Sequence, residues 1–200
     1  MNDVIIEGVT GAGKTSTIKA LASLTRFNLI NEDATFDGFM AAFLVDTEEA
    51  SRRARHRLES ILDRIEASDQ QPHLLERFHY SQLALGSSWK WYRDLDDRCA
   101  ALGYKIVVLV LPEEHLALRS LYRAEYEGKD WQGFIQRFGS EERALDAIRR
   151  SQQTRLEAVE ESRVQSRLID ASGKDWKAYA KSIAEGAGWA TDPIAGTPKP

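Results

Sequence analysis

Short apolar runs alternate with amphipathic segments along this chain. Such alternation is typical of a parallel β-sheet whose two faces are covered by helices. The runs that predict strands are Val4 to Ile6, Phe27 to Ile30, His73 to Glu76, Lys105 to Leu111 and Arg167 to Ile169. The run from Lys105 to Leu111 is the longest and is rich in β-branched residues, which predicts a strand buried on both faces.

Helical spacing of apolar residues fills the intervals between these runs. Ile18, Leu21 and Leu24 recur at this spacing behind the first strand. The expected helices begin at residue 14 and span about 38–45, 47–68, 89–102, 113–126, 141–164 and 176–185. Residues 186–200 carry three prolines and little periodicity. We therefore expect a single domain over residues 1–185 and a flexible tail over residues 186–200.

The composition supports one globular domain and argues against two kinds of partner. At 42% hydrophobic residues, a chain of 200 residues buries most of its apolar surface in one core. The formal net charge of -4 lacks the basic excess that sequence-independent nucleic-acid binding requires. No apolar run reaches membrane-spanning length, and the first strand starts without a leader. We expect a cytoplasmic protein that binds neither nucleic acid nor membrane.

The single cysteine and the four histidines do not suggest a disulfide or a metal site. Cys99 shares an apolar helical stripe with Leu95 and Leu102, which predicts a buried small side chain. The histidines lack the short spacing and the cysteine neighbours of a zinc site. No protein-ligated transition metal is therefore expected.

The segment from Gly8 to Thr15 reads Gly-Val-Thr-Gly-Ala-Gly-Lys-Thr and lies between a predicted strand and a predicted helix. It fits the phosphate-loop pattern G-x-x-x-x-G-K-[ST] in the context that this pattern requires. Glycines let successive amide groups converge on phosphate oxygens at the positive end of the helix. The expected ATP-binding residues are Gly8, Thr10, Gly11, Ala12, Gly13, Lys14, Thr15 and Ser16. Lys14 would neutralise charge on the β and γ phosphates, and the Thr15 hydroxyl would coordinate Mg2+.

A phosphate loop alone does not separate kinases from GTPases and ATPases. The chain has no N-K-x-D guanine-reading motif, which argues against a standard GTPase. A second magnesium ligand is expected at a strand end, where Glu76 competes with Glu113 and Glu114. Pro112 redirects the chain before the latter two, which then resemble acidic first-turn residues of a helix. We therefore favour Glu76.

Glu76 and Arg77 place an acid and a base together at the expected carboxyl end of the third strand, where ligand sites of parallel sheets form. Glu76 can hold magnesium directly or through water. Arg77 can clamp an anionic acceptor or approach the transferring phosphoryl group. The alternative is an ordinary ion pair on the surface.

On three stretches the chain resembles the thymidylate kinase and deoxynucleoside kinase superfamily. These stretches are Ile6 to Thr15, Leu75 to Ser81, and Arg119 with Arg123. Thymidylate kinases have the pattern E-G-x-D-G-A-G-K at the loop and D-R-Y-x-x-S after the third strand. Deoxynucleoside kinases have E-R-S at the second of these places, and both resemble the stretches of this chain. This resemblance implies an α/β, three-layer P-loop NTPase fold with a central, mostly parallel five-stranded sheet. It also implies an ATP- and Mg2+-dependent kinase.

The same resemblance implies roles for individual residues. Glu76 would bind magnesium, and Arg77 would contact the acceptor or the transferred phosphate. Arg119 and Arg123, one helical turn apart, would belong to a lid over about residues 119–140 that closes on the phosphates. The alternative for both lid arginines is that they coat a helix.

The acceptor is the part of the prediction that stays open. Thr10 stands where thymidylate kinases have an aspartate, whereas Glu32 or Asp33 is placed like the general base of deoxynucleoside kinases. A carboxylate base suits a hydroxyl acceptor, since a monophosphate is already an anionic nucleophile. Phe36 and Tyr80 adjoin these charged motifs and are candidate contacts for a flat acceptor.

The sequence leaves three functions open. The leading hypothesis is a kinase that phosphorylates a nucleoside or nucleotide as its small-molecule acceptor. The second is a kinase for another small alcohol, such as an antibiotic or a sugar-like metabolite. The third is a P-loop ATPase switch. The oligomeric state stays open, with a homodimer as one possibility.

Overall fold

The computed structural model describes residues 2–36, 47–68, 71–121, 136 and 138–191. Within these residues five parallel strands form one sheet in the order β2-β3-β1-β4-β5. They are β1 (Val4–Gly8), β2 (Asn28–Ile30), β3 (His73–Glu76), β4 (Lys105–Val110) and β5 (Gln165–Asp170). The predicted fold class is confirmed, and β1 is the middle strand.

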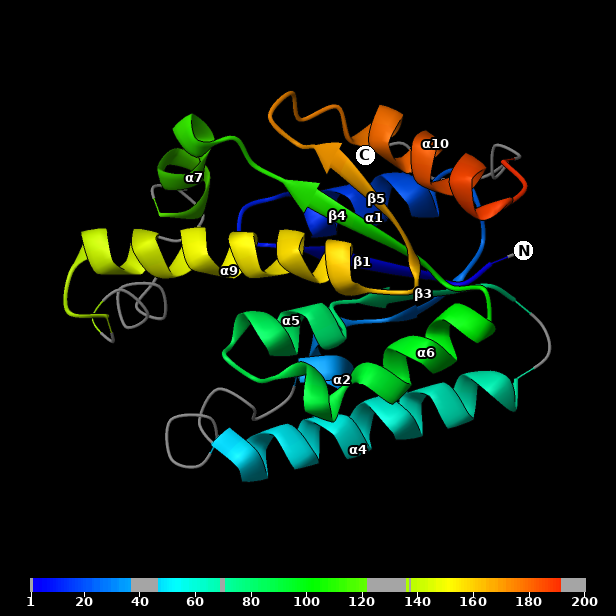
Figure 1. Cartoon of the computed structure of the whole chain (residues 1–200). Helices are drawn as coiled ribbons and strands as arrows, with labels where there is room; N and C mark the ends of the chain where they lie inside the picture. Colours follow the sequence, from blue (N-terminus) through cyan, green and yellow to red (C-terminus); the bar gives the residue numbers. More distant parts are fainter. Residues whose placement is uncertain (1, 37–46, 69–70, 122–135, 137, 192–200) are drawn as a thin grey trace.

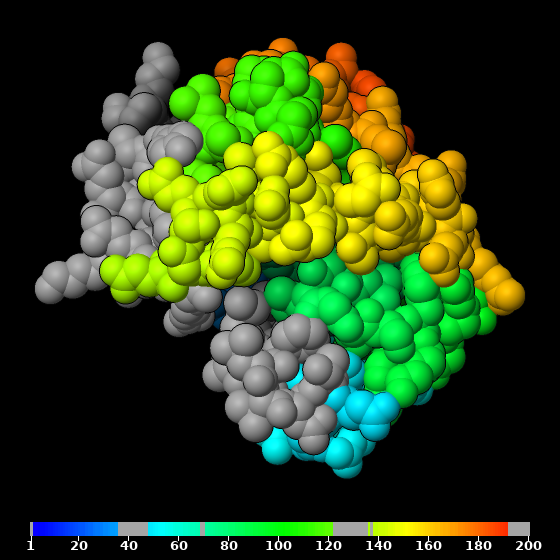
Figure 2. Space-filling view, turned by 60° about the vertical axis from the view of Figure 1, so that its left-hand side comes forward, coloured from blue at the N-terminus to red at the C-terminus, as the bar shows by residue number. Residues whose placement is uncertain are grey.

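Helices cover both faces of the sheet, so that the molecule has three layers (Figure 1). One face carries α1 (Lys14–Ala22), α7 (Glu113–Ser120) and α10 (Trp176–Ala187). The other carries α4 (Thr47–Glu66), α5 (His79–Ala84) and α6 (Arg93–Ala101), with the 3-10 turn η1 (Trp89–Trp91). The helix α9 (Glu141–Glu161) packs against both α7 and α5, and Figure 2 shows it in yellow between them.

Alternation along the strands divides the apolar residues into two cores. Val4 and Ile6 of β1 pack on the side of α1 and α10, whereas Ile5 packs on the side of α4. In β4, Ile106 and Val108 belong to the second core, and Val107 and Leu109 belong to the first, in the same alternating way. The expectation that this strand is buried on both faces is therefore confirmed. Cys99 is fully buried, and burial raises the pKa of its thiol.

Some predicted element boundaries differ from the structure, and two short helices were not predicted. The single helix expected over 89–102 is η1 followed by α6, and the helix expected over 141–164 ends at Glu161. The polar stretch after β2 folds as a short helix, α2 (Glu32–Phe36). Both α2 and α5 have six residues or fewer, which is too short for helical periodicity to be visible in the sequence. The helix expected at 38–45 and the end of the one expected at 113–126 lie outside the described residues.

The folded part extends beyond the expected boundary at residue 185. Helix α10 continues to Ala187 and ends at Gly188, whose left-handed backbone (φ 68°) is typical of a helix terminus. Trp189 is buried, stacks on Phe27 with ring centroids 5.6 Å apart, and donates its indole N–H to the Asn2 carbonyl at 2.7 Å. The tail was expected to begin at residue 186, but the folded part of the chain continues to Trp189, because this buried side chain follows Gly188.

None of the helices in the part of the chain that the structure describes is long and apolar enough to cross a membrane.

Candidate functional site

The phosphate loop is packed tightly between the end of α7 and the start of α10. Gly11 and Gly13 have left-handed backbones, with φ of 83° and 96°. A Cβ atom on Gly11 would lie 2.1 Å from the Arg119 carbonyl oxygen, and one on Gly13 would lie 2.2 Å from the Trp176 ring. Both backbone conformation and space therefore require glycine at these positions.

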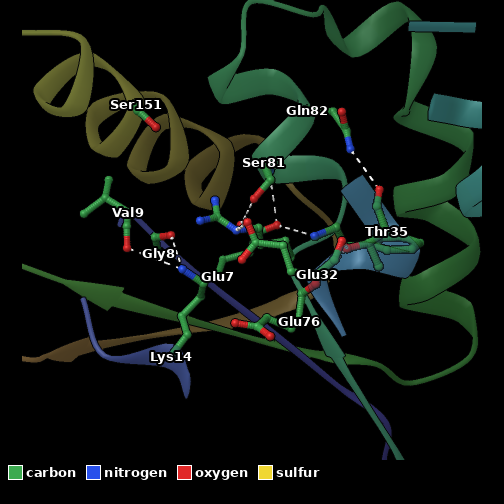
Figure 3. A network of polar contacts seen from close by, with 12 residues as sticks. Glu7, Gly8, Val9, Lys14, Glu32, Thr35, Glu76, Ser81, Gln82 and Ser151 are labelled. Carbon is green, nitrogen blue, oxygen red and sulfur yellow. Dashed lines mark hydrogen bonds and ion pairs between the residues drawn. The ribbon is translucent and has the colours of Figure 1, made fainter. Parts of the chain in front are cut away.

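Lys14 folds back over this loop from the first turn of α1. Its ammonium donates to the carbonyl oxygens of Gly8 at 3.1 Å and Val9 at 3.4 Å (Figure 3). Burial and the nearby Arg77 guanidinium lower the pKa of Lys14 to about 7, although Glu32 and Glu76 oppose the shift. The side chain is held where a phosphate chain on the loop would meet it.

A polar cavity of about 430 Å³ lies over the loop at the carboxyl ends of β1 and β3. Such a position is where ligand sites form in open parallel sheets. Its lining combines three cationic and two acidic side chains with loop residues. The residues are Thr10, Gly11, Gly13, Lys14, Thr15, Ser16, Lys19, Glu32, Glu76 and Arg77.

Two of the expected ATP-binding residues do not line this cavity. Gly8 contributes the carbonyl that receives the Lys14 ammonium. Ala12 is fully buried, and its amide donates to the Val9 carbonyl at 3.2 Å. Both residues shape the loop from within, and the other six face the cavity.

Glu32 and Arg77 meet on one wall of the cavity. The Arg77 Nε lies 2.9 Å from Glu32 Oε1. The Thr35 hydroxyl donates to the Glu76 carbonyl at 2.8 Å, and this bond ties α2 to the end of β3. Asp33 is exposed and does not line the cavity. Of the two carboxylates that the sequence left open, the structure therefore brings Glu32 into the site.

The residues expected to hold magnesium share the same cavity. Glu76 ends β3 and is largely buried, and burial raises the pKa of its carboxyl against the opposing charge of Lys14. Thr15 is exposed at the start of α1. One carboxylate and one hydroxyl beside a phosphate site suit Mg2+, which keeps waters and phosphate oxygens as its other ligands. The residues present therefore fit the ion.

Arg119 does not extend into a lid. It is buried, its Nη1 donates to the Ala171 carbonyl, and its guanidinium lies 5.3 Å from the centre of the Trp176 ring. These contacts anchor it to the body of the domain beside the loop, because the chain at Ala171 approaches the end of α7. Arg123 and most of the expected lid lie outside the described residues.

Of the two aromatic acceptor contacts expected from the sequence, Tyr80 is not brought into the cavity. Tyr80 is buried in the core below the sheet, its hydroxyl lies 3.2 Å from Ser166 Oγ in β5, and burial raises its pKa to about 12. The expectation for Tyr80 is therefore corrected. It faces β5 because it lies on the inner side of α5. The side chain of Phe36 lies outside the described residues.

The sequence reasoning missed a buried ionic cluster beneath the site, formed by Glu7, Ser81 and Arg155. Glu7 Oε2 accepts from Ser81 Oγ at 2.6 Å and from Arg155 Nε at 3.2 Å. Burial alone would raise the pKa of Glu7, but Arg155 and these hydrogen bonds hold it below the ordinary value. The sequence offered one indication of this cluster, which is the presence of Glu7 at the end of an apolar strand next to the loop. Arg155 gave none, because it lies in a long helix rich in charged residues.

No model of a protein family matches the sequence, and no curated protein sequence does either. Solved structures resemble the fold over nearly its whole length. The YorR protein of Bacillus subtilis, in complex with phosphorylated GDP, has a TM-score of 0.63 at 18% identity, over 92% of this chain and 95% of that one.

Two further solved structures are similar over nearly the whole chain. A sugar kinase from a Janibacter species has a TM-score of 0.61 at 18% identity, over 96% of this chain and 99% of that one. The deoxyadenosine kinase of M. mycoides with bound dATP has a TM-score of 0.57 at 12% identity, over 94% and 100%. At these identities the likeness establishes a shared fold alone.

Proposed function

We propose that this protein is an ATP- and Mg2+-dependent small-molecule kinase that phosphorylates a hydroxyl group of a nucleoside or nucleotide. The observation that carries the proposal is the Glu32–Arg77 pair, which shares one cavity with the phosphate loop and Lys14. A phosphate site alone would suit any P-loop protein. The carboxylate of Glu32 and the guanidinium of Arg77 in the same cavity suit the binding of a second substrate beside the phosphates.

The residues of the chain divide into a donor side and an acceptor side. Bound MgATP supplies the phosphoryl group and the divalent charge. On the donor side the loop amides and Lys14 hold the phosphates and offset the charge that spreads over their oxygens. Thr15 and Glu76 would hold the magnesium ion.

On the acceptor side Glu32 takes the proton of the attacking hydroxyl. The acceptor oxygen forms its bond to the γ phosphorus as the bond to the β-phosphate oxygen breaks, and ADP leaves. Arg77, 2.9 Å from Glu32, orients the carboxylate and faces the transferred group. A general base has this use only for a hydroxyl acceptor, and this favours an alcohol over a monophosphate group.

A kinase for another small alcohol is the second candidate, since Glu32 suits any hydroxyl acceptor. A screen of nucleosides, nucleoside monophosphates, sugars and amino-alcohol antibiotics with γ-labelled ATP separates the two. Transfer of label to a hydroxyl group of a nucleoside or nucleotide supports the first proposal, whereas transfer to the phosphate of a monophosphate contradicts the role of Glu32 as a base. Transfer only to another alcohol supports the second, and hydrolysis of ATP without transfer to any acceptor contradicts both.

The role of Glu32 is tested by a matched pair of variants in α2. With the acceptor found in the screen, Glu32→Gln should lower kcat by about 10²- to 10⁴-fold, because it removes the base. Asp33→Asn removes a neighbouring exposed charge and should leave kcat near that of the natural protein. Equal effects of both variants would contradict the assignment of Glu32.

A further inference from the structure

Arg77 has a backbone conformation that a non-glycine residue rarely adopts. Its φ is 62°, in the left-handed region. This conformation is unfavourable for an L-residue, so it persists only where the surroundings hold it. It is also the residue whose guanidinium faces Glu32 in the cavity.

The contacts that hold this turn come from β1. The Arg77 amide donates to the Ile6 carbonyl at 2.9 Å. The next amide, of Phe78, donates to Glu7 Oε1 at 2.7 Å, and the amide of Ser81 donates to the same oxygen at 3.1 Å. Phe78 supplies no side-chain cap to α5, so the Glu7 carboxylate caps this helix from another element.

Arg155 makes this use of a buried carboxylate possible. Glu7 and Arg155 are both almost completely buried, and a buried carboxylate without a partner is strongly destabilising. Arg155 Nε lies 3.2 Å from Glu7 Oε2, and Arg155 Nη2 donates to Ser81 Oγ at 2.9 Å. Arg155 is itself held by Ser151, one turn earlier in α9. Figure 3 shows Ser81 and Glu7 joined by a hydrogen bond, with Glu32 and Glu76 close by.

We infer that Glu7 is a positioning residue for Arg77, and that Arg155 keeps Glu7 charged for this task. The inference rests on the proposed function, in which Arg77 acts on the acceptor side. The Glu7 carboxylate is directed at the turn after β3 and not at the phosphate loop. Its loss should therefore impair use of the acceptor and leave ATP binding in place.

The first experiment measures the turn itself and requires no acceptor. Amide hydrogen exchange by NMR reports Phe78 and Ser81, and a crystal structure of each variant reports the φ of Arg77. In Glu7→Gln the uncharged side-chain amide either directs its NH2 group at the Arg155 guanidinium or no longer accepts hydrogen bonds from the Phe78 and Ser81 backbone amides. Exchange of Phe78 and Ser81 should become at least about tenfold faster. Unchanged exchange with Arg77 still at positive φ would overturn the inference.

The second experiment measures function with MgATP and the acceptor found in the screen. Glu7→Gln and Arg155→Met should lower kcat/KM for the acceptor by about tenfold or more, with the Kd for ATP changed less than about threefold. Arg155→Lys, which keeps the charge, should recover much of the loss. Arg150→Met removes an exposed arginine of the same helix and should behave like the natural protein.

Each failure has a distinct meaning. If no acceptor is phosphorylated, the proposed function fails, while exchange and the φ of Arg77 still decide whether Glu7 holds the turn. If the turn loosens but kcat/KM is unchanged, or if ATP affinity falls equally, the positioning role is overturned. Should Glu7→Gln not fold, Ser81→Ala removes one donor to the same carboxylate and serves in its place, with a smaller change expected in the same direction.

Discussion

Lys14 lies against two carbonyl oxygens of its own loop and has a pKa of about 7. A phosphate chain on the loop would stabilise its charged form and raise that pKa. Above pH 7 the binding of ATP should therefore take up a proton, and the Kd for ATP should rise with pH, by up to about tenfold per pH unit. Calorimetry at pH 8 in buffers of different ionisation enthalpy measures this uptake.

Two variants separate Lys14 from other titrating groups in this measurement. Lys14→Arg keeps its charge over the whole range, so the uptake that remains belongs to ATP and to other residues. Lys19→Met removes an exposed cation from the same cavity and should preserve the uptake. Identical uptake by the natural protein and by Lys14→Arg would show that Lys14 is charged before ATP binds.

At the scale of residues, the sequence predicted the parts of the site that follow each other in the chain. The loop residues and the Glu76–Arg77 pair were predictable because a short motif at a strand end fixes their place. Tyr80 was misjudged because proximity in sequence does not show which side of a short helix faces the core. Arg155 could not be predicted, because its role depends on a contact with a residue at the other end of the domain.

At the scale of elements, Gln152 fastens α9 to the end of β4. Its side-chain oxygen accepts from the Leu111 amide at 2.9 Å, and its amide donates to the Leu111 carbonyl at 2.8 Å, both buried. Gln152→Ala leaves both backbone groups unpaired and should lower the free energy of unfolding by about 2–4 kcal/mol. Urea denaturation measures this as a lower midpoint with an unchanged m value.

The neighbouring Gln153 provides the control. It is exposed and bonds only Glu157 on its own helix among the contacts described for it. Gln153→Ala should change the free energy of unfolding by less than about 0.5 kcal/mol. A loss of similar size in both variants would mean that helix propensity, and not the bonds to Leu111, accounts for the effect.

Strands and long helices were predictable, and short helices were not. The apolar runs at β1 and β4 and the long helices α4 and α9 have recognisable patterns, whereas the four residues of β3 were recognised from the alternation of strands and helices around them. The helices α2 and α5 are formed by tertiary contacts, through Thr35 and Glu7 respectively. Their formation depends on partners distant in sequence, which local patterns do not reveal.

At the scale of the whole molecule, the two ends of the described chain are joined. The Asn2 amide donates to the Ala187 carbonyl at 3.0 Å, and Trp189 donates to the Asn2 carbonyl and stacks on Phe27. Trp189→Ala should lower the free energy of unfolding by about 3–5 kcal/mol, because it removes a large buried side chain. Thermal and urea denaturation measure the change.

Trp189→Phe keeps an aromatic ring and loses the hydrogen bond to Asn2, so it should cost only about 1 kcal/mol. A change below about 0.5 kcal/mol in Trp189→Ala would contradict the role of this residue as an anchor. The fold class was predictable at this scale, because alternating strands and helices leave few arrangements. The contact between the two ends of the described chain was not predictable, because it depends on Trp189, which lies beyond the last periodic segment.

The pair of Glu7 and Arg155 joins positions 148 residues apart. During synthesis the first strand, the phosphate loop and the turn after β3 leave the ribosome well before α9 exists. Closing so long a loop is slow, because the chain entropy is lost before the contact forms. The nascent chain should therefore acquire its acceptor side last, and an incomplete chain that ends before α9 should not transfer phosphate to its acceptor.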